Sequence, residues 1–535
     1  MTTTRTKKAT RKTAGKAAKK ATEKPSPAED RAGRRAWCGL ALLALPTLLV
    51  GVDINVLLLA LPRLTAELRP SGTEQLWITD SYGFMTAGFV ITMGTLGDRI
   101  GRRRLLLIGA AGFGAASVLA AFSTGATMLI GARLLLGLAG AALMPSTLAL
   151  ITSMFAEGRQ RGRAISIWAT CNFTSAALGP VLGGFLLQHF WWGSVFLVAA
   201  PVMLLVLVAG PLLLPEYRNP APGRADPVSV ALSLVAVLPI VYGIKRLAVP
   251  EGGGGPALPV AAIVVGGCVG ALFVRRQLRL PTPLLDLRLF RNPTFTAVLC
   301  ALVLAGFAMA GTGLLGTQFL QSVLDLSPTT AALWFAPMGL AVGLGTLLAP
   351  TLGRKLPLPA AIAAGLAVSV LGCLLITRVG AGGGPLPLAL GVAVLALGTG
   401  PLFALGIGVV LGAVPAERAG SAASMSETGN FFGASLGMAV LGAAGTGLYQ
   451  HRMAGPVADA TAAGLPPGAA HSARETLAGA VGAAHRLPER AAADLLRAAH
   501  DAFTGGLHVA GVAGAVIFAG LAVWFLRVHR RSRRV

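Results

Sequence analysis

Four ionisable side chains lie inside long apolar runs of the sequence, where a charge is costly and therefore informative. They are Asp53, Asp80, Arg133 and Glu427. On insertion scales, each charge near the centre of a bilayer costs about 2.5–3.5 kcal/mol, so each needs an opposite charge, water or a proton. Burial in apolar surroundings favours the protonated form of a carboxylic acid. These residue types predict proton binding and release, together with recognition of a charged solute.

The four charges lie at different depths. At 1.5 Å per residue, Asp53, Asp80 and Arg133 lie about 8–12 Å from the outer ends of their runs, whereas Glu427 is nearer the inner end of its run. We expect Asp53 and Arg133 to form an ion pair, either as coupling machinery or as a static brace. Asp80 and Glu427 are candidates for cation recognition. Alternatively, Asp80 is tolerated near a helix N-terminus, and Glu427 is a water-accessible residue near the inner surface.

The apolar runs that hold these charges predict an all-α membrane protein. Of the 535 residues, 54% are hydrophobic and 12% are charged, and the mean hydropathy is +0.71, whereas soluble proteins contain about 25% charged residues. At about 20 residues per span, fourteen runs qualify as transmembrane helices. They cover residues 37–61, 74–96, 105–123, 128–151, 165–187, 195–214, 228–244, 258–274, 295–319, 330–352, 358–376, 386–414, 421–448 and 507–526.

Lys and Arg residues are distributed unevenly between the two sides of this map. With the N-terminus inside, the cytoplasmic segments hold 34 of the 45 Lys and Arg residues, and the outer loops hold 10. Because Lys and Arg favour the cytoplasmic side, we expect a multi-pass protein of the cytoplasmic (inner) cell membrane. Both termini would be cytoplasmic and loop 450–505 external. Within that loop, residues 473–486 and 488–503 are predicted to form short surface helices.

The net charge of +24 is explained by this topology, so no nucleic-acid partner is expected. Residues 1–35 form a basic tail without the apolar core of a signal peptide, predicted to be disordered and attracted to membrane lipids. The five cysteines lack the spacing of a disulfide framework or a zinc site. The sequence also has no phosphate-binding loop of the ATPase type. We therefore expect no metal, no cofactor other than protons as the coupling ion, and no enzymatic activity.

The link between the second and third runs combines glycines with charges at fixed spacing. It contains Gly94, Asp98, Arg99, Gly101, Arg102 and Arg103. The glycines permit a tight turn, and the carboxylate can hold or release a partner on another helix. An ordinary basic cytoplasmic loop would not need this framework. The stretch resembles, position by position, a signature of the major facilitator superfamily, which implies a conformational latch.

Three further stretches are similar to this superfamily. Residues 179–184 contain Gly179, Pro180, Gly183 and Gly184 and resemble a proton-antiporter motif, although Ser175 stands where an upstream glycine is expected. Proline and glycine together favour a helix bend. Residues 131–140, around Arg133, resemble a motif with a membrane-embedded arginine. Residues 283–295 are similar to a linker of the fourteen-span drug:proton antiporters, the QacA-type multidrug efflux branch.

The resemblance implies a major facilitator fold with alternating access. Two six-helix bundles would occupy residues 36–214 and 295–526, with an inserted helix pair at 228–274 and a basic cytoplasmic tail at 527–535. It implies a monomeric antiporter that uses the proton motive force to export lipophilic, cationic drugs or biocides, with Asp53 as the coupling acid.

Two other transport functions stay open at this point. The first is a narrow exporter of one secondary metabolite that gives self-resistance, because 36 Arg against 9 Lys indicates a GC-rich genome. The second is a proton-coupled symporter that imports a solute, although the antiporter-like motif and the buried acids disfavour it.

Overall fold

The computed structural model of the chain describes residues 33–70, 72–155, 157–216, 226–248, 257–280, 287–291, 293–412, 414 and 419–532. Within these ranges the regular structure consists of α-helices, a short 3₁₀-helix η1 (Leu287–Arg291) and a short π-helix η2 (Phe319–Val323), without a β-strand. This part of the chain is therefore all-α, as the apolar runs predict.

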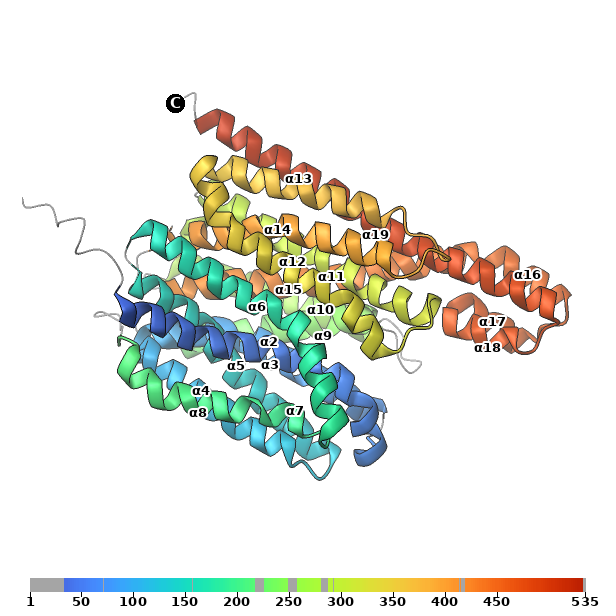
Figure 1. Ribbon diagram of the computed structural model, residues 1–535, viewed down its shortest axis with the longest axis horizontal. Helices are drawn as coiled ribbons and strands as arrows, with labels where there is room; N and C mark the ends of the chain where they lie inside the picture. Colours follow the sequence, from blue (N-terminus) through green and yellow to red (C-terminus); the bar gives the residue numbers. More distant parts are fainter. Residues whose placement is uncertain are drawn as a thin grey trace, which may run out of the picture.

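The first group of helices lies in the lower half of Figure 1, coloured blue to green. It contains α2 (Arg34–Leu68), α3 (Gly72–Ile100), α4 (Arg102–Ala121), α5 (Ala126–Met154), α6 (Gly158–His189), α7 (Ser194–Leu197) and α8 (Ala199–Leu213). Within it, α2 packs against α6, and α5 packs against both α3 and α4. The predicted sixth span comprises α7 and α8, which are separated only at Val198 and together form one 20-residue candidate span.

The second group, yellow to red in Figure 1, packs around α14 and α15. It contains α11 (Pro293–Gln318), α12 (Pro328–Lys355), α13 (Leu358–Ile376), α14 (Leu386–Gly412), α15 (Ala419–Arg452) and α19 (Glu489–Ser532). The two groups meet where α6 packs along α12 and where α15 packs against α3 and α5. At the first contact, the Oγ1 atoms of Thr170 and Thr346 lie 2.7 Å apart. Helix α6 also contacts α14, where the rings of Phe173 and Phe403 lie 4.6 Å apart.

Between the two groups in sequence lie α9 (Pro227–Ala248) and α10 (Ala257–Arg279), and α9 contacts both α3 and α15. Asp226, just before α9, accepts two hydrogen bonds from Arg276 of α10, at 2.9 and 3.1 Å. Ser229 Oγ also donates to Asp226 Oδ2 at 2.6 Å. The hydrogen bond from Arg276 is the main reason that the pKa of Asp226 is lowered to about 2. This pair joins the two inserted helices at one end.

Helical structure is found in each of the fourteen predicted runs, with α7 and α8 together in the sixth. In the described residues, eleven helices are long and apolar enough to cross a membrane by themselves, or twelve if the bent helix α6 is one span. The apolar part of α9, Val228–Ile244, is shorter. The multi-pass architecture therefore follows from the structure, while the number fourteen stays a prediction.

The segment after α15 is more helical than predicted. It forms α16 (Ala454–Ala462), α17 (Pro467–Glu475) and α18 (Leu477–Ala484), which lie at the opposite end of the molecule from the C-terminus (Figure 1). The prediction of a separate surface helix over 488–503 is wrong, because these residues continue into the last apolar run as one 44-residue helix, α19. The helix continues through Gly505 and Gly506, which pack closely against Arg452 and Gly445.

Candidate functional site

Asp53 of α2 and Arg133 of α5 form a buried ion pair. Arg133 Nη1 donates to Asp53 Oδ2 at 2.6 Å, and the two residues are 9% and 1% exposed. Arg133 has two further contacts: its Nε donates to the carbonyl oxygen of Ile78 at 3.2 Å, and its Cζ lies 4.8 Å from the ring centroid of Tyr82. The expected pairing is therefore present, and α2, α3 and α5 all contribute to it.

The glycines that follow Arg133 explain how α5 approaches α3. Gly137 and Gly140 lie one and two turns after Arg133, on the same helix face. A Cβ atom at Gly137 would meet the backbone carbonyl of Tyr82, and one at Gly140 would lie 2.8 Å from the Tyr82 hydroxyl. Thr86 Oγ1 also lies 3.1 Å from the carbonyl oxygen of Gly137. Only glycine lets α5 bring the guanidinium this close to Tyr82.

Glu427 lies on α15, and its surroundings differ from those of Asp53. The residue is 7% exposed, and in the described ranges no hydrogen bond or ion pair to its carboxylate is found. Gly433 and Gly437 pack directly on the backbone of α11, while a Cβ at Gly429 would lie 3.2 Å from Val303. At 100° per residue, Glu427 is about 200° from Gly429 around the helix. It therefore lies on the side of α15 opposite Gly429 and need not share the contact with α11.

Asp80 belongs to α3, but its side chain lies outside the described part of the structure. Its predicted role in cation recognition stays a prediction.

The predicted latch residues form a compact cluster at the junction of α3 and α4. Arg102 forms an ion pair with Asp98, and its Nη1 donates to the carbonyl oxygen of Gly94 at 3.1 Å. Gly101 connects the helices with a φ of +110°, a conformation that favours glycine. Arg99 lies in the last turn of α3. The partner of Asp98 is thus on the next helix in the chain.

Arg103 extends this cluster to the end of α8. Its Nη1 donates to the carbonyl oxygens of Pro211 and Leu214 at 3.2 and 3.1 Å. Its Nε lies 3.4 Å from Glu216 Oε2, and a Cβ at Gly101 would collide with the same carboxylate. The latch residues therefore connect three helices of the first group.

Helix α6 bends by 46° at residue 176. Pro180 explains this position, because a proline ring in a helix clashes with the carbonyl group four residues earlier; its own side chain lies outside the described residues. Gly179 and Gly183 are buried, and Gly184 is partly exposed with open space beside it. Ser175, the departure from the antiporter motif, faces Gly51 of α2, where a Cβ would collide with the serine hydroxyl. At this contact the glycine is thus on α2, at Gly51, and the serine is on α6.

Residues 43–443 match the Major Facilitator Superfamily. The chain belongs to this superfamily. It is 42% identical over 499 residues to the multidrug efflux pump LfrA of Mycolicibacterium smegmatis, which covers 93% of this chain and 97% of LfrA. It is also 33% identical to the methyl viologen resistance protein SmvA of Salmonella typhimurium, over 93% of this chain and all of SmvA. Within the superfamily, the chain belongs to the drug-efflux branch.

The fold is that of other major facilitator proteins. The crystal structure of the human organic anion transporter MFSD10 (TETRAN) matches with a TM-score of 0.56 and 15% sequence identity, over 91% of this chain and 99% of that one. The family and the relatives are transporters, and the many apolar helices make this chain a multi-pass membrane protein.

Two residues that contact these charged groups were not predicted from the sequence. Tyr82 is 2% exposed and lies against Arg133; its sequence signal is the pair of glycines on α5, whose partner could not be identified. Glu216 contacts both Arg103 and Arg104. The sequence feature that could have indicated this role is an acidic residue just after the sixth apolar run. In the described residues, no group of three or more His, Cys, Asp or Glu side chains is placed to hold a metal ion.

Proposed function

We propose that this chain exports lipophilic, cationic drugs or biocides in exchange for protons, as a monomer in the cytoplasmic membrane and without a cofactor or covalent chemistry. The observation that carries the proposal is the buried pair of Asp53 and Arg133. A static brace between two helices does not need a titratable group in apolar surroundings. A coupled transporter does, since a proton must bind and leave during each cycle.

The contacts of Arg133 support such a cycle. When Asp53 binds a proton, it loses its charge and the ion pair weakens. Arg133 keeps the carbonyl oxygen of Ile78 and the ring of Tyr82 as partners, so its charge is not left without contacts. Proton binding can therefore loosen α2 from α5 without exposing an isolated charge.

Glu427 supports the choice of a cationic substrate. It is a buried carboxylate with no described ion-pair partner, and a buried charge is stable only when it is paired. A positively charged solute would supply that charge from outside the protein. The name of SmvA, a methyl viologen resistance protein, supports a cationic substrate, because methyl viologen is an aromatic dication.

Everted membrane vesicles test this proposal. A preformed proton gradient should collapse partly when a quaternary ammonium dye is added to vesicles that contain the protein, and should not respond in vesicles without it. A symporter would instead acidify the external medium only when a solute leaves the vesicle lumen together with the protons. A susceptibility panel of quaternary ammonium biocides, dyes and neutral antibiotics distinguishes a multidrug pump from a narrow exporter of one metabolite.

The proposed orientation places both termini in the cytoplasm and helices α16–α18 outside. Ser472 of α17 is exposed, whereas Ala470 is buried, so Ser472→Cys is the suitable reporter in a background without the five native cysteines. We expect an impermeant thiol reagent to label it in intact cells. Labelling that requires permeabilised cells would reverse the orientation, and Ala470→Cys serves as the matched buried control.

A further inference from the structure

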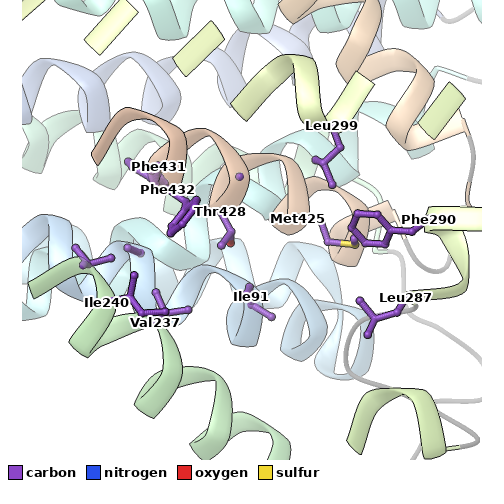
Figure 2. Close-up of a pocket in the computed structure, with 13 residues that line it drawn as sticks. Ile91, Val237, Ile240, Leu287, Phe290, Leu299, Met425, Thr428, Phe431 and Phe432 are labelled. Carbon is purple, nitrogen blue, oxygen red and sulfur yellow. The ribbon is translucent and has the colours of Figure 1, made fainter. Parts of the chain in front are cut away.

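An apolar cavity of about 260 Å³ lies between the two bundles and the inserted helix pair. Its walls come from α3, α9, α11, α15 and η1, through residues such as Ile91, Val237, Leu299 and Phe432. Figure 2 shows Thr428 between α15 and the helix that carries Ile91. Because three parts of the fold line one cavity, its shape must change whenever the bundles move.

The cavity holds one polar group without a partner. Thr428 Oγ1 is buried and has no hydrogen bond, although it lines a cavity that is otherwise apolar. A threonine in a helix can satisfy its hydroxyl with the carbonyl group of the preceding turn, as Ser426 does with Ala422. The hydroxyl of Thr428 is instead available to a molecule in the cavity.

The size and lining of the cavity define the class of ligand. A cavity of about 150 Å³ accommodates benzene, so this one suits a body of two fused rings. Phe290 and Phe431 add aromatic surfaces to the wall, and aromatic rings favour stacked or edge-on contacts with one another. A saturated lipid chain would fill the space but would leave the Thr428 hydroxyl without a partner, which is unfavourable.

The position of the cavity on α15 relates it to Glu427. Met425, Thr428, Gly429 and Phe432 line the cavity from one face of α15, and Phe431, four residues after Glu427 and close to it around the helix, also lines it. A molecule in the cavity thus contacts a residue, Phe431, that follows Glu427 by about one helix turn. The two features can act one after the other on a single substrate.

We propose that this cavity is an entry site, in which the flat aromatic part of a lipophilic substrate binds beneath α9 with a hydrogen-bond acceptor on Thr428, before the substrate reaches Glu427. The inference rests on the proposed export function. It assigns the inserted helices a role in substrate capture, since Val237 and Ile240 of α9 form one wall.

A photoaffinity probe tests the site without requiring transport. The probe is 2-acetylnaphthalene with a diazirine group, used on the purified full-length protein in lipid nanodiscs, and labelled peptides are mapped by mass spectrometry. We expect labelling on α9 and on residues 425–432 of α15. Val237→Phe should abolish it by filling the cavity. Val235→Phe is the matched control, because Val235 is 50% exposed on α9 and does not line the cavity.

The hydrogen bond is tested separately with variants of nearly unchanged shape. Thr428→Val should reduce labelling about fivefold, as expected for the loss of one hydrogen bond, whereas Thr428→Ser should keep it. A naphthalene probe with ethyl in place of acetyl should not distinguish threonine from valine. Equal labelling of the parent and Val237→Phe, or complete competition by a saturated fatty acid, would overturn the proposal.

These results are distinguishable from a failure of the export function. If the probe labels the cavity as expected but substrate drives no proton exchange, the site stands and the antiport proposal is wrong. If exchange continues with unchanged KM in Val237→Phe and Thr428→Val, antiport stands and the entry site is wrong.

Discussion

Asp53 and Glu427 are both buried carboxyl groups on helices of a membrane transporter, but their surroundings differ. Asp53, in the first bundle, has a guanidinium partner at 2.6 Å, and that partner has further contacts of its own. Glu427, in the second bundle, is equally buried and has no described partner. The difference suggests a division of roles. The paired acid, Asp53, can release its ion-pair partner when it binds a proton. The acid without a described partner, Glu427, is suited to bind a cation from outside the protein.

The largest expected effect is a loss of folding stability when Arg133 of the paired site is replaced. Arg133→Met leaves Asp53 buried without its counter-ion, and the loss of one partner of a buried pair costs about 3–5 kcal/mol. Asp53→Asn combined with Arg133→Met should recover most of this stability, because no charge then remains unpaired. Thermal unfolding and the yield of monodisperse protein measure both.

Glu427→Gln is the matched control for this experiment. It removes a buried charge without leaving a described partner alone, so its stability should be close to the parent's. If the double variant at Asp53 and Arg133 is as unstable as Arg133→Met, the two residues are not energetically coupled and the comparison fails.

A smaller effect comes from the latch, which belongs to the same bundle as the paired site but lies at the junction of α3 and α4. Asp98→Asn should reduce transport several-fold while the protein still inserts and folds, because Arg102 keeps the carbonyl oxygen of Gly94 as a partner. Uptake into everted vesicles at matched expression gives the rate. Glu216→Gln is a useful second variant, since Glu216 contacts Arg103 and Arg104, whereas Asp98 pairs with Arg102. Parental rates in Asp98→Asn would show that this ion pair has no role in transport.

The smallest effect concerns a paired acid outside the predicted spans. The pKa of Asp226 is lowered from 3.8 to about 2, so its pair with Arg276 stabilises the fold above the usual pKa and loses this contribution as the pH falls through about 2. Asp226→Asn should lower the melting temperature by about 1–3 °C at pH 7. The difference from the parent should shrink between about pH 4 and pH 2. A difference that does not change with pH would mean that the carboxylate charge is not responsible.

Much of the paired site could be predicted because charges in apolar runs need partners. Asp53 and Arg133 were the natural pair, since they have opposite charge at similar depth. Tyr82 could not be predicted as the third member, because an aromatic residue in an apolar helix has many possible contacts. The exchange of small residues between Ser175 and Gly51 is also invisible in sequence, since it depends on which helices are neighbours.

The local turns and helix ends were predicted with mixed success. Gly101 was correctly placed at a tight turn, because the framework of glycine and charge is local in sequence. The separation of residues 488–503 from the last apolar run was wrong, since α19 continues through Gly506, which lies against Gly445. Packing of distant segments decided that outcome, and the sequence pattern contained no information on it.

The division of roles between the two acids is tested most directly by proton release in proteoliposomes. The parent, Asp53→Asn and Glu427→Gln are reconstituted as folded protein, and the internal pH is followed after addition of a quaternary ammonium dye or a neutral lipophilic antibiotic. We predict that Asp53→Asn abolishes proton exchange for both substrates, because an amide cannot bind or release a proton. Glu427→Gln should lose exchange with the dye but keep it with the neutral compound. Near-parental exchange by Asp53→Asn would contradict the account and move proton coupling to another acid.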